Sequence, residues 1–137
     1  MRVEKTPAIY ACLDVSGSFD PHGLTAMLGA DARITRAGEV RRNGAVREFD
    51  SWHFSTPKVA SVDWPAQLDQ VLELVRPRLD EFLTFCRVRA LGVEVHLVAE
   101  MSGETPIGSF TTDQIAYLAL LGCSLDIDLY EKRGEHE

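Results

Sequence analysis

The chain has 137 residues, 45% of them hydrophobic and 26% charged, which excludes disorder or a fibrous repeat and fits one globular domain over residues 1–137. Its 14 Lys and Arg against 21 Asp and Glu give a net charge of −7, unfavourable for following a phosphate backbone, so we expect no nucleic-acid partner. No apolar run approaches the roughly 20 residues that cross a bilayer, and Met1 to Pro7 lack the apolar block of a signal peptide. We therefore expect a cytoplasmic protein without a membrane partner.

The first part of the chain predicts a strand, a helix and a hairpin. Apolar residues alternate from Ala8 to Val15, as in a strand with one covered face. Asp20 and Pro21 predict a helix start, because the carboxylate can cap free amides and proline fits the first turn, and Gly29 can end that helix. Residues 45–56 are predicted to form one arm of a hairpin.

The middle of the chain predicts its longest helix. Apolar residues recur three or four apart over residues 65–86, the spacing of one helical face. Pro77 lies inside this stretch, where it removes an amide and crowds the preceding turn, so we expect a kink or a division near Arg76. Alternation then predicts a strand over residues 92–98.

The last part predicts a helix and a one-sided strand. Thr111 and Gln114 fit a capping box at a helix start. Strict alternation over residues 123–130 predicts a strand with one apolar face and one polar face. We expect its inward residues to be Leu125, Ile127 and Leu129 and its outward residues to be Asp126, Asp128 and Tyr130. The ordered core is expected to span about residues 8–130, followed by a frayed tail at 131–137.

Charge is distributed unevenly along the chain. Residues 1–90 hold 12 basic and 12 acidic side chains, whereas residues 91–137 hold 2 and 9, so the acidic excess lies in the last third. Five arginines, by contrast, gather around a predicted turn, and we interpret them as a solvated hairpin tip, with an anion site as the alternative. These five are Arg33, Arg36, Arg41, Arg42 and Arg47.

A series of motifs extends along nearly the whole chain. It comprises the first strand, the Asp20-Pro21 helix start ending in Met27-Leu28-Gly29, the stretch Arg36-Ala37-Gly38-Glu39, Trp52 with Ser55, and Leu121-Gly122 followed by Asp126-Ile127-Asp128-Leu129-Tyr130. From about Ile9 to Tyr130 this order resembles the bacterial domain of unknown function 4279 family. The resemblance implies a compact α+β domain and supplies no catalytic residue, because that family has no established activity. We expect an α+β fold with a single mixed or antiparallel β-sheet and about three helices packed on one face, in a strand order that the sequence does not fix.

The outward residues of the predicted strands form a polar, acidic face. Two histidines and several carboxylates there could coordinate zinc, manganese or iron, whereas ordinary solvated side chains are the alternative, and we assign no metal and no cofactor. Trp52 is expected to be a core anchor, with the wall of a ligand cleft as the alternative. The candidate ligand or partner face comprises Asp14, Trp52, His53, Glu94, His96, Asp126, Asp128 and Tyr130.

The remaining reactive side chains give no catalytic signature. Cys12, Cys86 and Cys123 are widely spaced among apolar neighbours, so we interpret them as small buried hydrophobic residues, with a disulfide or a zinc cluster as the alternative. The sequence contains neither a Gly-x-Ser-x-Gly motif nor a cysteine in an electropositive setting. We therefore predict no catalytic residue.

These observations favour a non-enzymatic interaction module. Its acidic surface suits a basic protein partner, in the manner of an immunity protein. The alternative is an enzyme or a small-molecule or metal binder that uses the outward face of the sheet. Pairing of two copies through an edge strand, as a homodimer, stays open as well.

Overall fold

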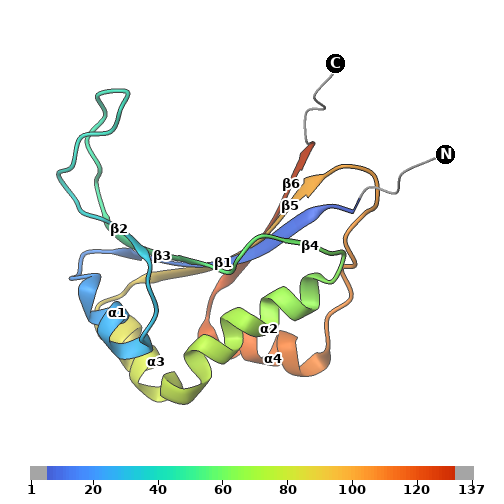
Figure 1. Ribbon diagram of the computed structural model, residues 1–137. Helices are drawn as coiled ribbons and strands as arrows, with labels where there is room; N and C mark the ends of the chain where they lie inside the picture. The colour runs from blue at the N-terminus through green and yellow to red at the C-terminus, as the bar shows by residue number, and fades with distance from the viewer. Residues whose placement is uncertain (1–5, 132–137) are drawn as a thin grey trace.

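One mixed sheet of six strands, with the described helices on one of its faces, forms the framework of the chain (Figure 1). The computed structural model describes residues 6–131. The strands are β1 (Ala8–Gly17), β2 (Arg33–Thr35), β3 (Asp50–Ser55), β4 (Val59–Ala60), β5 (Gly92–Met101) and β6 (Ser124–Glu131). The helices are α1 (His22–Leu28), α2 (Trp64–Val75), the short 3₁₀ helix η1 (Arg76–Arg78), α3 (Leu79–Val88) and α4 (Thr112–Leu121). The predicted α+β class is confirmed.

The strand order is β2-β3-β1-β5-β6, with β4 paired to the start of β1. The long central strand β1 runs antiparallel to both β3 and β5. Strand β6 runs parallel to β5, because the connection between them passes through α4 and parallel strands need such a crossover. This single parallel pair makes the sheet mixed, and β6, last in the strand order, lies at one edge.

The core lies between the sheet and the helices. Every second residue of β1, from Ile9 to Val15, is completely buried on the helix side. Helix α2 packs its apolar face against these residues, and Phe82 of α3 extends the same core. The core contributions of α2 are Trp64, Leu68, Val71, Leu72 and Val75.

The predicted long helix is divided where proline falls. Helix α2 ends at Val75, Pro77 lies in η1, and α3 continues from Leu79, because the proline ring and its missing amide interrupt the helical ladder. At the other end of α2, the side chain of Asp63 accepts a hydrogen bond from the amide of Ala66 at 3.1 Å. The α2–η1–α3 segment, α1 and α4 are therefore the three helical segments that the sequence predicts.

The predicted helix ends are confirmed in their main features. Asp20 Oδ1 accepts a hydrogen bond from the amide of His22 at 3.1 Å, although α1 begins at His22, one residue later than predicted, with Pro21 just before it. Gly29 ends α1 in the left-handed conformation with a φ of 64°. The amide of Gln114 donates to Thr111 Oγ1 at 3.1 Å, and the amide of Thr111 donates to Gln114 Oε1 at 2.9 Å. The capping box thus fixes where α4 begins.

The predicted burial of β6 is wrong. Ile127 is the register partner of Leu97, which is completely buried, so the apolar residues of β6 do lie on the helix side of the sheet. They are nevertheless exposed: Leu125 by 37%, Ile127 by 53% and Leu129 by 56%. Alternation predicts the face that a side chain occupies, but it does not predict whether a helix covers that face, and the helices leave this edge uncovered.

The ends of the described chain also differ from expectation. Glu131, predicted to begin a frayed tail, is the last residue of β6. The rest of that predicted tail, residues 132–137, lies outside the described residues, as do residues 1–5 of the segment considered for a signal peptide. Within residues 6–131, every helix is too short or too polar to cross a membrane.

Candidate functional site

The face of the sheet opposite the helices carries most of the predicted polar residues. Asp14 on β1 lies directly opposite Glu94 on β5 and directly opposite His53 on β3. His96 lies two residues beyond Glu94 and therefore on the same face, because side chains alternate along a strand. The prediction that these residues share one surface is confirmed.

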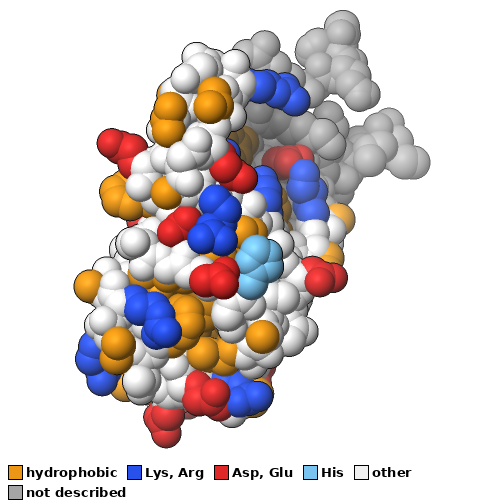
Figure 2. All heavy atoms as spheres, turned by 90° about the vertical axis from the view of Figure 1, so that its left-hand side faces the viewer, with side chains coloured by type: hydrophobic (Ala, Val, Ile, Leu, Met, Phe, Trp, Pro, Cys, Tyr) orange, Lys and Arg blue, Asp and Glu red, His pale blue; other side chains and the backbone are white. Residues whose placement is uncertain are grey.

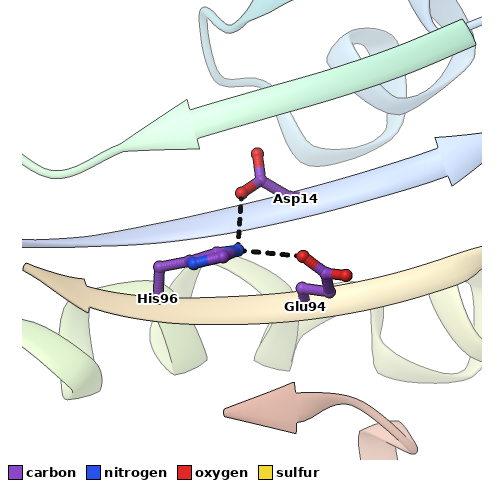
Figure 3. Close-up of side chains that lie close together, drawn as sticks. All are labelled: Asp14, Glu94 and His96. Atoms are coloured by element: carbon purple, nitrogen blue, oxygen red, sulfur yellow. Dashed lines mark hydrogen bonds and ion pairs between the residues drawn. The ribbon is translucent and has the colours of Figure 1, made fainter. Parts of the chain in front are cut away.

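His96 lies at the centre of this group of side chains (Figure 3). Its Nε2 atom is 3.0 Å from Glu94 Oε1 and 3.2 Å from Asp14 Oδ2. One potential ligand atom from each of these three residues lies within 4.8 Å of the other two. Asp14 extends from β1, whereas Glu94 and His96 extend from β5, so two neighbouring inner strands of the sheet position all three side chains.

A second layer of polar side chains surrounds these three residues. His96 Nδ1 is 3.4 Å from Asp128 Oδ2 and 3.6 Å from Asp126 Oδ2, both on β6. On the other side, His53 Nδ1 contacts Asp14 Oδ1. We call these six residues the open-face cluster: Asp14, His53, Glu94, His96, Asp126 and Asp128.

The environment of the two histidines favours their charged form. The hydrogen bond to Asp14, with a smaller contribution from Cys12, raises the pKa of His53 to about 9. Burial lowers the pKa of His96, but the hydrogen bond to Glu94 and the nearby charge of Asp14 outweigh it, so the net shift is upward. Even with both rings protonated, the four carboxylates leave the open-face cluster with an excess of negative charge.

Two predicted site residues lie outside this cluster. Trp52 occupies the helix-covered face of β3, because it alternates with His53, and it is completely buried. Its Nε1 donates a hydrogen bond to Thr25 Oγ1 of α1 at 3.0 Å, so Trp52 is a core anchor and not part of the polar surface. Tyr130 lies on the polar face opposite Glu100, farther along β6 than the carboxylates that contact His96.

The arginine-rich segment forms a hairpin that projects from the sheet (Figure 1). Its turn is closed by a hydrogen bond from the amide of Gly44 to the carbonyl of Arg41 at 2.9 Å, as the turn sequence predicts. Arg36, at its base, pairs with Asp50 and Asp20. Figure 2 shows the end of the molecule from which this hairpin projects, and acidic and basic side chains are interspersed on its surface. This mixture of charges favours a solvated surface over an anion site.

The three cysteines are all free. Cys12 and Cys86 are buried, as expected of small hydrophobic residues, whereas Cys123 is half-buried. Burial raises the pKa of Cys86 to about 11, so its thiol stays protonated and unreactive at neutral pH.

Comparison with models of known protein families shows the family to which the chain belongs. A family model described as a domain of unknown function, DUF4279, matches residues 7–132. The chain belongs to this family. The resemblance inferred from the sequence motifs is therefore confirmed over nearly the same residues. No curated protein and no solved structure matches this DUF4279 chain.

The arrangement allows two kinds of chemistry. Imidazole nitrogen and carboxylate oxygen together suit divalent transition metals, and the same groups without a metal present an acidic surface to a basic partner. The sequence predicted all six residues of the open-face cluster in this DUF4279 chain, but it missed the exposed apolar side of β6. No signal in the alternation of β6 could have revealed that exposure, because it depends on strand order.

Proposed function

We propose that the chain is an interaction module of the bacterial cytoplasm that binds an extended, basic segment of a partner protein along the edge of β6. One observation carries this proposal. Strand β6 has eight residues, pairs within the described residues with β5 alone, and exposes three aliphatic side chains on the helix side.

An uncovered edge strand is a natural binding site for another strand. Among residues 6–131, no strand pairs with its outer backbone amides and carbonyls, and an added segment would supply hydrogen bonds to them. Proteins commonly protect such edges with proline, a bulge or charged side chains, above all lysine. Strand β6 contains neither proline nor lysine, pairs with β5 in unbroken register, and carries only acidic charges, which a basic segment can neutralise. An added strand would also cover part of Leu125, Ile127 and Leu129, whose exposure otherwise costs stability and solubility.

The charges of β6 favour a basic partner over a second copy of the chain. Two copies paired antiparallel around Ile127 would set Asp126 directly opposite Asp128, and like charges in that position destabilise a strand pair. A segment that alternates apolar residues with Lys or Arg would instead match the aliphatic side chains on one face and the carboxylates on the other. The acidic excess after residue 90 supports the same choice of partner, because opposite charges accelerate association.

The free state of the cysteines supports the proposed location in the cytoplasm. All three are free, and free thiols suit the reducing conditions of the cytoplasm.

The experiment measures binding of short synthetic peptides to the full chain by fluorescence anisotropy. We expect a peptide of alternating Val and Arg to bind more tightly than a peptide of the same composition with its Val and Arg in separate blocks. Amide hydrogen exchange should show new protection in β6 when the alternating peptide is bound. Added salt should weaken the binding, since Coulombic attraction contributes to it.

Two variants and one control locate the binding site. Ile127→Asp should abolish the preference for the alternating peptide, and the double change of Asp126 and Asp128 to Asn should reduce both affinity and salt dependence. Val88→Asp is the matched control, because Val88 is 74% exposed on α3, outside β6. Equal binding of both peptides, or binding without new protection in β6, would refute the proposal. Concentration-dependent dimerisation through β6 would identify a second copy as the occupant instead.

A further inference from the structure

We propose that Asp14, Glu94 and His96 bind a divalent transition-metal ion on the open face of the sheet. Asp128 and His53 support this site by holding His96 and Asp14 in place. The three ligands come from β1 and β5, so the site shares only its supporting carboxylate, Asp128, with the proposed partner site on β6.

The spacing of the donor atoms fits one shared ion. Around a tetrahedral zinc with bonds of 2.0–2.2 Å, neighbouring ligand atoms lie about 3.3 Å apart. The distances from His96 Nε2 to Glu94 Oε1 and to Asp14 Oδ2, 3.0 and 3.2 Å, are already close to that value. The three ligand atoms lie within 4.8 Å of one another, and rotation of the two carboxylates can close the remaining gap.

The backbone explains why the three donors converge. Asp14 and Glu94 are cross-strand partners, so their Cβ atoms start about 5 Å apart. His96 follows on the same face of β5, and both strands are inner strands of the sheet, with neighbours on both sides. Donors fixed on such strands need little reorganisation to hold an ion.

The surroundings of the donors match the outer layer of a metal site. A histidine that binds metal through one nitrogen usually donates its other N–H to a carboxylate, which fixes the ring orientation. Here His96 Nδ1 faces Asp128 at 3.4 Å and leaves Nε2 directed at the two ligand carboxylates. His53 Nδ1 holds the second oxygen of Asp14 in the same way. A mere group of acidic side chains would lack this two-layer order.

The open-face cluster carries an excess of negative charge, which favours the binding of a cation. Among the described residues, the four carboxylates of this cluster form ion pairs with His53 and His96 and with no Lys or Arg. Lys58, the one lysine within residues 6–131, pairs instead with Glu100, which lies farther along β5. The imidazole donor favours transition metals such as zinc over calcium or magnesium, which prefer oxygen. Three protein ligands leave at least one position for water.

The test is isothermal titration calorimetry of chelator-treated full chain with Zn²⁺. We expect binding of one ion, and a reduction of affinity by at least tenfold in Glu94→Gln and in His96→Gln. Asp128→Asn should weaken binding about tenfold, as outer-layer changes do. Calcium in place of zinc should bind far more weakly. With Co²⁺, the visible spectrum should show bound ion in the parent chain and lose that signal in His96→Gln.

Two matched controls isolate the site. Glu100→Gln removes a carboxylate on the same strand and face, and His22→Gln removes an exposed histidine that also contacts a carboxylate, that of Asp20. Both should retain the affinity of the parent chain. Glu94 has a half-exposed side chain, so Glu94→Gln should fold normally, and circular dichroism checks this. Zinc binding unchanged in Glu94→Gln and His96→Gln, or no zinc binding by the folded parent chain, would overturn the proposal.

Discussion

Truncation of two neighbouring residues on the same face of the sheet tests whether β6 is a free edge. Leu97 and Ile127 are register partners on β5 and β6, yet Leu97 is completely buried and Ile127 is 53% exposed. Leu97→Ala should cost about 2–5 kcal/mol, because it removes buried methyl groups and leaves a cavity. Full burial of such a side chain contributes about 1.5–3 kcal/mol, so for the half-exposed Ile127 the Ala variant should lose only about 1 kcal/mol.

Urea denaturation of the two variants and the parent chain provides the measurement, repeated at two protein concentrations. A loss of 1 kcal/mol lowers the urea midpoint by about 0.3–1 M, because the free energy of unfolding of a small protein falls by about 1–3 kcal/mol per molar urea. If Ile127→Ala costs as much as Leu97→Ala, something covers Ile127 and the argument for a free edge fails. A cost that depends on protein concentration would identify that cover as another copy of the chain.

Two further predictions concern a buried carboxylate and a buried thiol. Hydrogen bonds from the amides of Ala37 and Phe19 and from Arg36 hold the pKa of Asp50 below its ordinary value of 3.8. The ionised carboxylate therefore stabilises the fold at pH values above 3.8. This contribution is lost as the pH falls through the lower pKa of the folded state. Asp50→Asn should therefore unfold at lower urea than the parent chain at neutral pH, and the difference should shrink under strongly acidic conditions. Burial raises the pKa of Cys86 to about 11, so its thiol should resist a thiol reagent in the folded chain and react only on unfolding, whereas the half-buried Cys123 should react first. Mass spectrometry of labelled peptides distinguishes the two cysteines. Early labelling of Cys86 would contradict its burial.

The features that the sequence predicted correctly are those set by neighbouring residues. Pro77 divides the long helix because its ring clashes within one turn, and Thr111 with Gln114 caps α4 through contacts three residues apart. Alternation likewise placed Asp14 and His96 on one face, since the direction of a side chain in a strand depends only on its position along that strand.

The features that could not be predicted depend on contacts between distant segments. The burial of Ile127 depends on whether a helix reaches beyond β5, and the position of β6 at the edge follows from the path of the chain through α4. The contact between His96 and Asp128 depends in the same way on the parallel register of β5 and β6. Asp50 gave no signal in the sequence, because its three donors come from two separate loops and become neighbours only in the folded chain.

The peptide site lies along β6, whereas the three metal ligands come from β1 and β5, and this makes the two tests separable. The aliphatic side chains of β6 lie on the helix side, whereas Asp126 and Asp128 lie on the open face beside His96. Asp128 is the residue that both proposals use, so the double change of Asp126 and Asp128 to Asn should weaken zinc binding and peptide binding together. Ile127→Asp changes the aliphatic side alone and should leave zinc affinity unchanged, while Glu94→Gln changes a β5 ligand and should leave the choice between peptides unchanged. Failure of one proposal therefore leaves a distinct pattern from failure of the other.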